Sequence, residues 1–61
     1  NGIKIGDSQN QVAQKMQPYY QLSVEPDWLN YLMPNGQIYS FGFFEGKLYK
    51  VNVREAPDWK N

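Results

Sequence analysis

The chain has no cysteine and no histidine among its 61 residues, and these absences exclude several kinds of protein. Without cysteine there is no disulfide framework, and without either residue the usual ligands of zinc and of the softer transition metals are missing. The common pairing of a nucleophile with an imidazole base is missing as well. We therefore expect no metal site, no cofactor and no catalysis of this kind.

The chain also has neither an excess of one charge nor a long apolar run. Six basic and six acidic residues balance, whereas binding of double-stranded nucleic acid needs a basic surface that neutralises several phosphates. No apolar run approaches the ~20 residues of a membrane-spanning helix or the length of a signal-peptide core. We expect no double-stranded nucleic acid among the partners and no membrane span in this chain.

Aromatic residues are abundant, with two Trp, five Tyr and three Phe. A domain of this length buries only ~60% of the surface that its unfolded chain exposes. Since disulfide and metal staples are missing, the core must depend on dense packing, and aromatic side chains supply large buried areas. We predict that residues 1–61 form a single small domain.

Residues 8–17 carry the signals of a short helix. Ser8 and Gln11 have the three-residue spacing of a capping box. Pro18 ends the helix because it lacks a backbone donor and disfavours helical geometry in the residue before it. A helix of this length is not stable alone in water, so we expect it to pack on a sheet.

Extended segments and turns make up the rest of the chain. The segments span residues 20–24, 28–33, 37–43 and 47–54, and residues 56–61 form a tail. The turns are Glu25-Pro26-Asp27, Pro34-Asn35-Gly36 and Glu45-Gly46. The sequence therefore predicts an α+β fold, with one N-terminal helix packed on a three- or four-stranded antiparallel β-meander.

Two registers compete at the hairpin around Glu45-Gly46. A two-residue turn pairs Phe44 with Lys47 and mixes apolar and polar residues on both faces. A three-residue loop pairs Phe43 with Lys47 and makes one face almost wholly apolar, which a slip of one residue would destroy. We predict the three-residue loop, with Phe41 opposite Tyr49.

This register divides the sheet into two faces. The predicted core face, which the helix covers with Val12, Ala13 and Met16, comprises Leu29, Tyr31, Met33, Tyr39, Phe41, Phe43, Tyr49, Val51 and Val53. The opposite face carries four apolar side chains, Trp28, Leu32, Ile38 and Leu48, and two basic ones, Lys50 and Arg54. It also carries the small or polar residues Asn30, Ser40, Gly42 and Asn52. Trp28 lies opposite Gly42, where an aromatic ring can cover a bare backbone.

Residues that could carry chemistry have local structural explanations. Ser8 is a helix cap, and Ser23 and Ser40 have no imidazole to activate them. The acidic residues lie at the helix start, in turns or near the tail, and none has the spacing of a calcium-binding loop. They are Asp7, Glu25, Asp27, Glu45, Glu55 and Asp58. We predict that the chain is not an enzyme.

The segment Tyr39-Ser40-Phe41-Gly42-Phe43-Phe44 alternates aromatic and small residues, as the RNA-stacking strand of an RNA-recognition motif does. The basic residue that precedes that motif is missing here, because Gln37 and Ile38 stand in its place. Aromatic side chains that belong to the core cannot also stack on bases. For these reasons, single-stranded nucleic-acid binding by aromatic stacking, with Lys47, Lys50 and Arg54, ranks behind protein binding and is the alternative function.

Several segments occur in a characteristic order: Gly2-Ile3-Lys4-Ile5-Gly6-Asp7-Ser8, a short helix with Val12, Met16-Gln17-Pro18, and a meander that ends Phe41-Gly42-Phe43-Phe44-Glu45-Gly46-Lys47-Leu48. In this order of segments the chain resembles the BamE (SmpA/OmlA) and BLIP-like group of small domains. The resemblance implies a helix on one face of an antiparallel sheet, a binding or scaffolding role without catalysis, and a location in the bacterial cell envelope or periplasm. BamE-like members assist the assembly of outer-membrane proteins, and BLIP-like members bind an enzyme across a concave sheet. No motif carries either role onto particular residues of this chain.

We therefore predict a non-catalytic protein-binding or scaffolding module whose partner is another protein or a second copy of the chain. Aromatic and arginine side chains together are enriched at protein interfaces. The predicted partner-binding residues are Trp28, Leu32, Ile38, Leu48, Lys50 and Arg54. A further alternative is structural, namely a fragment of a larger protein whose exposed face packs on the missing part.

Overall fold

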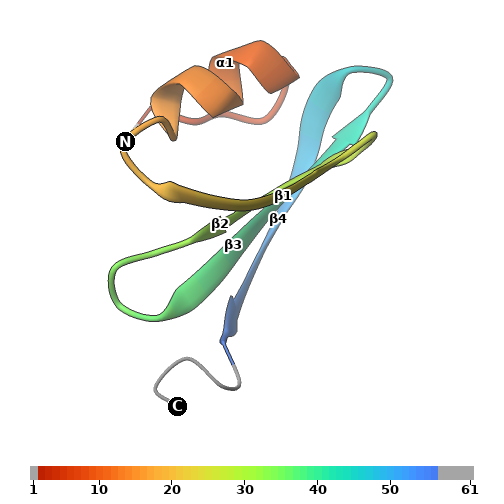
Figure 1. The fold of residues 1–61 in the computed structure, drawn as a ribbon. Coiled ribbons are helices and arrows are strands. Elements are labelled where there is room, and N and C mark those ends of the chain that lie inside the picture. Colours follow the sequence, from red (N-terminus) through yellow and green to blue (C-terminus); the bar gives the residue numbers. More distant parts are fainter. Residues whose placement is uncertain (1, 57–61) are drawn as a thin grey trace.

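The computed structural model describes residues 2–56, which form one helix and a four-stranded antiparallel sheet. Helix α1 (Gln9–Lys15) is followed by strands β1 (Tyr20–Glu25), β2 (Trp28–Leu32), β3 (Gln37–Phe44) and β4 (Lys47–Glu55). The strands lie side by side in chain order, and α1 lies on one face of the sheet (Figure 1). The predicted fold class is confirmed. The predicted tail lies, from residue 57 on, outside the described residues.

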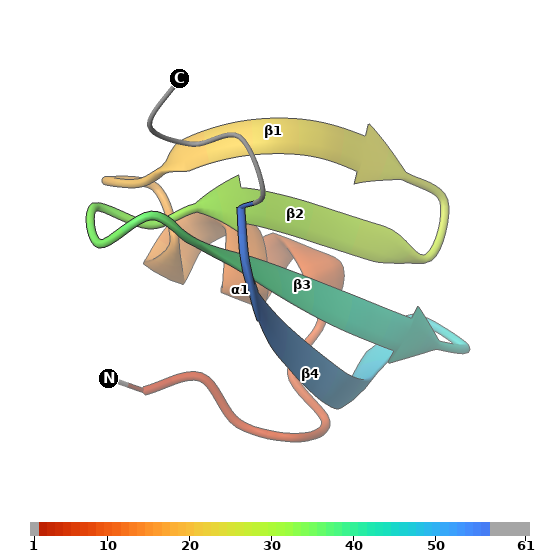
Figure 2. The same cartoon turned by 90° about the horizontal axis from the view of Figure 1, so that it is seen from below.

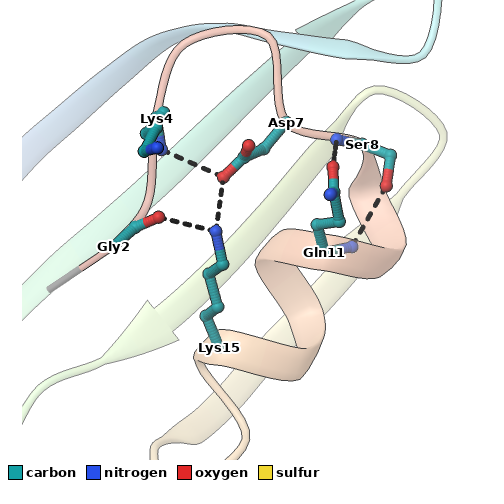
Figure 3. A network of polar contacts seen from close by, with 6 residues as sticks. All are labelled: Gly2, Lys4, Asp7, Ser8, Gln11 and Lys15. Carbon is teal, nitrogen blue, oxygen red and sulfur yellow. Dashed lines mark hydrogen bonds and ion pairs between the residues drawn. The ribbon is translucent and has the colours of Figure 1, made fainter.

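Helix α1 begins with the capping box that the sequence predicts. The Ser8 hydroxyl accepts a hydrogen bond from the backbone N–H of Gln11 at 3.1 Å, and the Gln11 side-chain oxygen accepts one from the backbone N–H of Ser8 at 2.8 Å (Figure 3). These bonds satisfy two of the donors that a helix start leaves unpaired.

Asp7 ties the segment before the helix to α1. Its Oδ2 atom accepts hydrogen bonds from the backbone N–H of Lys4 and from Nζ of Lys15, both at 3.0 Å (Figure 3). The same Nζ atom donates to the carbonyl of Gly2 at 2.6 Å. The bond from the Lys4 backbone, followed by that from Lys15, lowers the pKa of Asp7 below its ordinary value of 3.8.

The segment before α1 also pairs with the start of β4. The N–H of Gly6 donates to the carbonyl of Leu48 at 2.8 Å, and the N–H of Leu48 donates to the carbonyl of Asp7 at 2.7 Å. Figure 2 shows this segment running beside β4. The first part of β4 is therefore not a free sheet edge.

The core lies between α1 and the central strands. Its buried apolar residues are Val12, Met16, Leu29, Tyr31, Phe41, Phe43 and Leu48. The rings of Tyr31 and Phe41 meet edge to face, with centroids 6.0 Å apart and planes at 71°. We call the sheet face that packs against α1 the inner face and the opposite one the outer face.

The register predicted for β2 and β3 is confirmed, with the pairs Leu29–Phe41, Tyr31–Tyr39 and Trp28–Gly42. The predicted three-residue loop joins these strands. The N–H of Met33 donates to the carbonyl of Gln37 at 2.8 Å, and Gly36 has a φ of 86°. That backbone conformation is in the left-handed region, which glycine enters without steric cost.

The register predicted for β3 and β4 is wrong. The hairpin turns through only two residues, so that Phe44 lies opposite Lys47. Both turn residues have a positive φ, 53° at Glu45 and 80° at Gly46. Positive values at both positions define the type I′ turn, whose twist matches that of the flanking strands.

A β-bulge follows this turn. Phe43 lies opposite Leu48 but Gly42 lies opposite Lys50, so Tyr49 is an extra residue in β4. Beyond the bulge, Phe41 lies opposite Val51. The bulge reconciles the favoured two-residue turn with apolar pairing, which neither uninterrupted register does.

The bulge changes which residues of β4 are buried. Leu48 pairs with Phe43 on the inner face and is only 1% exposed, so its predicted place on the outer face is wrong. Tyr49, Val51 and Val53 were predicted in the core but are 51%, 41% and 49% exposed. Tyr49 is exposed because it is the extra residue of the bulge. Val51 and Val53 are exposed because α1 has only seven residues, and β4 runs away from it toward the C-terminal end of the strand (Figure 1).

Candidate functional site: the outer face of the sheet

The outer face is the candidate site because no helix or strand of residues 2–56 covers it. Figure 2 shows α1 behind the sheet, with the outer face toward the viewer. All four strands contribute to this face.

Strand pairing arranges the outer-face residues in three rows, each with one residue from every strand. The first row is Glu25, Trp28, Gly42 and Lys50; the second, which we call the polar row, is Ser23, Asn30, Ser40 and Asn52; the third is Tyr20, Leu32, Ile38 and Arg54. A bulge at Leu22 in β1 places both Tyr20 and Ser23 on this face. Without that bulge the two residues would alternate to opposite faces.

The polar row forms the floor of a hollow. Its side chains are short, whereas the rows on either side carry large ones. The hollow has a volume of about 360 Å³ and is lined by Leu22, Ser23, Glu25, Trp28, Asn30, Ser40, Asn52 and Arg54. This volume lies at the lower end of the ~300–1,000 Å³ range of ligand pockets in proteins.

Two hydrogen bonds fix side chains on this floor. The amide of Asn30 donates from Nδ2 to Oγ of Ser23 at 3.0 Å. The guanidinium of Arg54 donates from Nη1 to Oγ of Ser40 at 3.1 Å. Arg54 thus reaches from the third row over the polar row, and it satisfies the buried hydroxyl of Ser40.

Trp28 covers Gly42, as the sequence predicts. A Cβ atom placed on Gly42 would lie 2.9 Å from Cη2 and 3.0 Å from Cζ3 of the indole. Nζ of Lys50 lies over the same ring, 5.7 Å from its centroid, and 5.5 Å from the ring centroid of Tyr49. Both distances are within the range of cation–π attraction.

The structure brings five of the six predicted partner-binding residues together on the outer face. Three of them are half-buried and two are exposed: Trp28, Leu32, Ile38, Lys50 and Arg54. Leu48 is in the core instead. The sequence reasoning placed Asn30, Ser40 and Asn52 on this face but missed Ser23, since its place depends on a bulge that no local turn residue signals.

The two basic residues of this face have no carboxylate partner in the described part of the chain. The single ion pair within residues 2–56 joins Lys15 and Asp7, which lie in α1 and in the segment before it. Across the same range, no three acidic side chains gather where they could share a metal ion. Nor does that range contain a helix that is long and apolar enough to cross a membrane.

The aromatic residues of β3 are largely on the other side of the sheet. Phe41 is 2% exposed and Phe43 is 3% exposed, both in the core beneath α1. Tyr39 is half-buried against the same core. Bases cannot stack on rings that are covered in this way.

Comparison of the chain with models of protein families, with curated proteins and with solved structures finds no match in any of the three.

Proposed function

We propose that this domain is a non-catalytic protein-binding or scaffolding module, which contacts another protein or a second copy of itself through the outer face. The observation that carries the proposal is a sheet face that no helix or strand of residues 2–56 covers, with the half-buried apolar side chains of Trp28, Leu32 and Ile38 beside the cations of Lys50 and Arg54. Apolar patches rimmed by polar groups mark interaction sites, and aromatic and arginine side chains are enriched in them.

The size of the domain supports an interface of this kind. A standard protein–protein interface covers ~800 Å² on each partner. The whole accessible surface is 4420 Å², so such an interface would occupy about a fifth of it.

The hydrogen bonds of the outer face support a role without catalysis. The Ser40 hydroxyl accepts its bond from Arg54, whose guanidinium stays protonated and cannot act as a base. The Ser23 hydroxyl accepts its bond from the amide of Asn30, which is not basic either. These contacts orient the two hydroxyl groups without activating them as nucleophiles.

The proposal extends to a relationship with the BamE-like and BLIP-like group and to a place in the bacterial cell envelope. Both rest on the sequence resemblance. The layout with a helix on one face of an antiparallel meander is the layout that the resemblance implies.

A structural role within a larger protein is the second candidate, and the inner face favours it. On its β4 side, the inner face carries Val51 and Val53, which are 41% and 49% exposed beyond α1, and on its β1 edge Val24 is 62% exposed, so residues 2–56 leave these apolar side chains uncovered. A further part of a longer chain would bury these side chains. Single-stranded nucleic-acid binding has weaker support, because Phe41 and Phe43 are buried.

Site-specific photo-crosslinking in an extract of the source cells tests the leading proposal. A photoreactive benzoylphenylalanine replaces Leu32 or Ile38 on the outer face, or Gln14 on the exposed side of α1 as the control. We expect one crosslinked protein from both outer-face positions, little from Gln14, and a lower yield when Trp28→Ala is added. Equal crosslinking from Gln14, or none from Leu32 and Ile38, would refute the proposal, and a nuclease-sensitive product would favour nucleic acid instead.

A further inference from the structure

We propose that the hollow over the polar row binds an extended peptide segment of the partner, and that an acidic side chain of this segment pairs with Arg54 at the β4 end. The inference rests on the proposed function, since it names the chemistry of the partner segment that the outer face accepts. The dimensions of the hollow, its floor and its charges each support it.

The hollow has the dimensions of a short extended peptide that crosses the strands. Neighbouring strands are ~4.8 Å apart, so the polar row spans about 14 Å from Ser23 in β1 to Asn52 in β4. An extended chain advances ~3.3 Å per residue, and about four residues cover this length. Trp28 of the first row and Leu32 and Ile38 of the third row stand on either side of such a segment. The Arg54 guanidinium reaches over the polar row at its β4 end, where it bonds to Ser40.

The floor of the hollow suits a peptide backbone. Hydroxyl and amide groups of Ser23, Asn30, Ser40 and Asn52 line it and offer both donors and acceptors. A covered peptide group must keep its hydrogen bonds, and the polar row supplies partners at several points along the segment. A purely apolar segment would instead leave these polar groups buried without partners, which is unfavourable.

The charges at the two ends of the hollow have opposite signs. Arg54 lines the hollow on β4, with one N–H bonded to Ser40 and with no carboxylate partner among residues 2–56. The planar guanidinium has five donors and binds carboxylates through two parallel bonds. Lys50 adds a second positive charge on the same strand, whereas Glu25 lines the β1 end. The segment should therefore carry its acid at the β4 end and a neutral or basic residue at the β1 end.

A saccharide is the other ligand that an indole beside amide groups suggests, and the surroundings of Trp28 disfavour it. A sugar ring stacks on an open aromatic face. Here the indole lies against Gly42, and Nζ of Lys50 lies over the ring at 5.7 Å from its centroid. The observations therefore favour a charged peptide over a sugar.

The test is an NMR titration of the ¹⁵N-labelled chain with a capped pentapeptide, acetyl-Glu-Ser-Thr-Ser-Lys-amide, whose acid and base are four residues apart. The matched control peptide has Gln in place of Glu. We expect shift changes at backbone amides of the polar row and a Gln peptide that binds about tenfold more weakly, the usual scale for losing a charged hydrogen-bond partner. Chitotriose is titrated in parallel as the saccharide probe.

Variants of Arg54 test whether its guanidinium contacts the acidic side chain of the peptide. Arg54→Gln should weaken the binding of the Glu peptide by about tenfold. Arg54→Lys should weaken this binding less, because lysine keeps the charge but loses the two-bond geometry. Lys47→Gln is the matched control, since Lys47 is a cation of β4 that does not line the hollow. It should leave the affinity unchanged. Circular dichroism checks that each variant is folded.

Several results would overturn the inference: equal binding of the Glu and Gln peptides, equal binding by Arg54→Gln, shift changes confined to the inner face, tighter binding of chitotriose, or no peptide binding at about 10 mM. The crosslinking from Leu32 and Ile38 reports on the proposed function separately. A crosslinked protein without peptide binding would refute the acidic segment alone. The absence of both crosslinking and peptide binding would refute the proposed function as well.

Discussion

Replacing Gly42 by alanine should destabilise the domain through Trp28 rather than through the backbone. Gly42 is buried, and its φ does not lie in the positive range that L-residues avoid. The added Cβ atom would meet the indole at 2.9 Å and Cγ of Lys50 at 3.2 Å. Because a Cβ atom rarely has contacts this short, the indole must move away from the sheet.

The expected cost follows from two opposing effects. Overpacking costs ~1–3 kcal/mol, and the short contacts with both the indole and Lys50 place the cost near the middle of that range, at about 2 kcal/mol. Replacing glycine by alanine inside a strand gains ~0.5–1 kcal/mol. We expect a net loss of about 1 kcal/mol, which leaves the variant folded if the domain has the usual stability of ~3–9 kcal/mol for its size.

A double-mutant cycle isolates the contact. Trp28→Ala alone should cost about 2 kcal/mol, since the indole is only half-buried and full burial is worth ~3–5 kcal/mol. In the Trp28→Ala background, Gly42→Ala should become stabilising by ~0.5–1 kcal/mol, because the Cβ atom no longer meets a ring. Urea unfolding followed by circular dichroism measures all four free energies. If Gly42→Ala costs the same in both backgrounds, Trp28 does not cover Gly42 and the description of the outer face is wrong.

Four further variants test the rest of the fold. Leu48→Ala should lower the free energy of unfolding by ~2–4 kcal/mol because its side chain is in the core, whereas Tyr49→Ala should lower it by less than about 1 kcal/mol; similar losses would contradict the bulge. Ser8→Ala removes the capping box and should cost ~1 kcal/mol in urea unfolding, and an unchanged midpoint would show that the cap is unimportant. The lowered pKa of Asp7 means that its carboxylate stabilises the fold above pH 3.8 and that this stabilisation is lost as the pH falls through the pKa of the folded state. Asp7→Asn should therefore be less stable than the wild type near neutral pH and should lose less stability on acidification. Parallel pH profiles of the two proteins would show that the bonds from Lys4 and Lys15 to Asp7 do not cause the pH dependence of stability.

Elements with local signals could be predicted from the sequence. The capping box of Ser8 and Gln11 marks the start of α1, and the Pro34-Asn35-Gly36 loop sets the register of β2 and β3. From that register the pairing of Trp28 with Gly42 follows directly. In each case the residues that determine the geometry lie within a few positions of one another.

The two bulges could not be predicted in the same way, because a bulge depends on pairing between strands. Leu48 and Val51 are three residues apart, and a regular strand would place them on opposite faces. The bulge at Tyr49 lets both pair with apolar residues of β3. The bulge at Leu22 has the same effect on β1 and completes the polar row with Ser23. The hollow could therefore be recognised only from the paired sheet.

The central claim is that the outer face is an accessible surface of the chain in solution. Paramagnetic relaxation of the NMR signals by a neutral gadolinium chelate tests it most directly, at low and at high protein concentration. We predict strong broadening of the side-chain amide signals of Asn30 and Asn52 at low concentration and little effect on the methyl signals of Val12 and Leu48. Protection of Asn30 and Asn52 that appears only at high concentration would identify a second copy as the partner. Protection of both amides at low concentration would contradict the claim, because the chain itself would already cover this face.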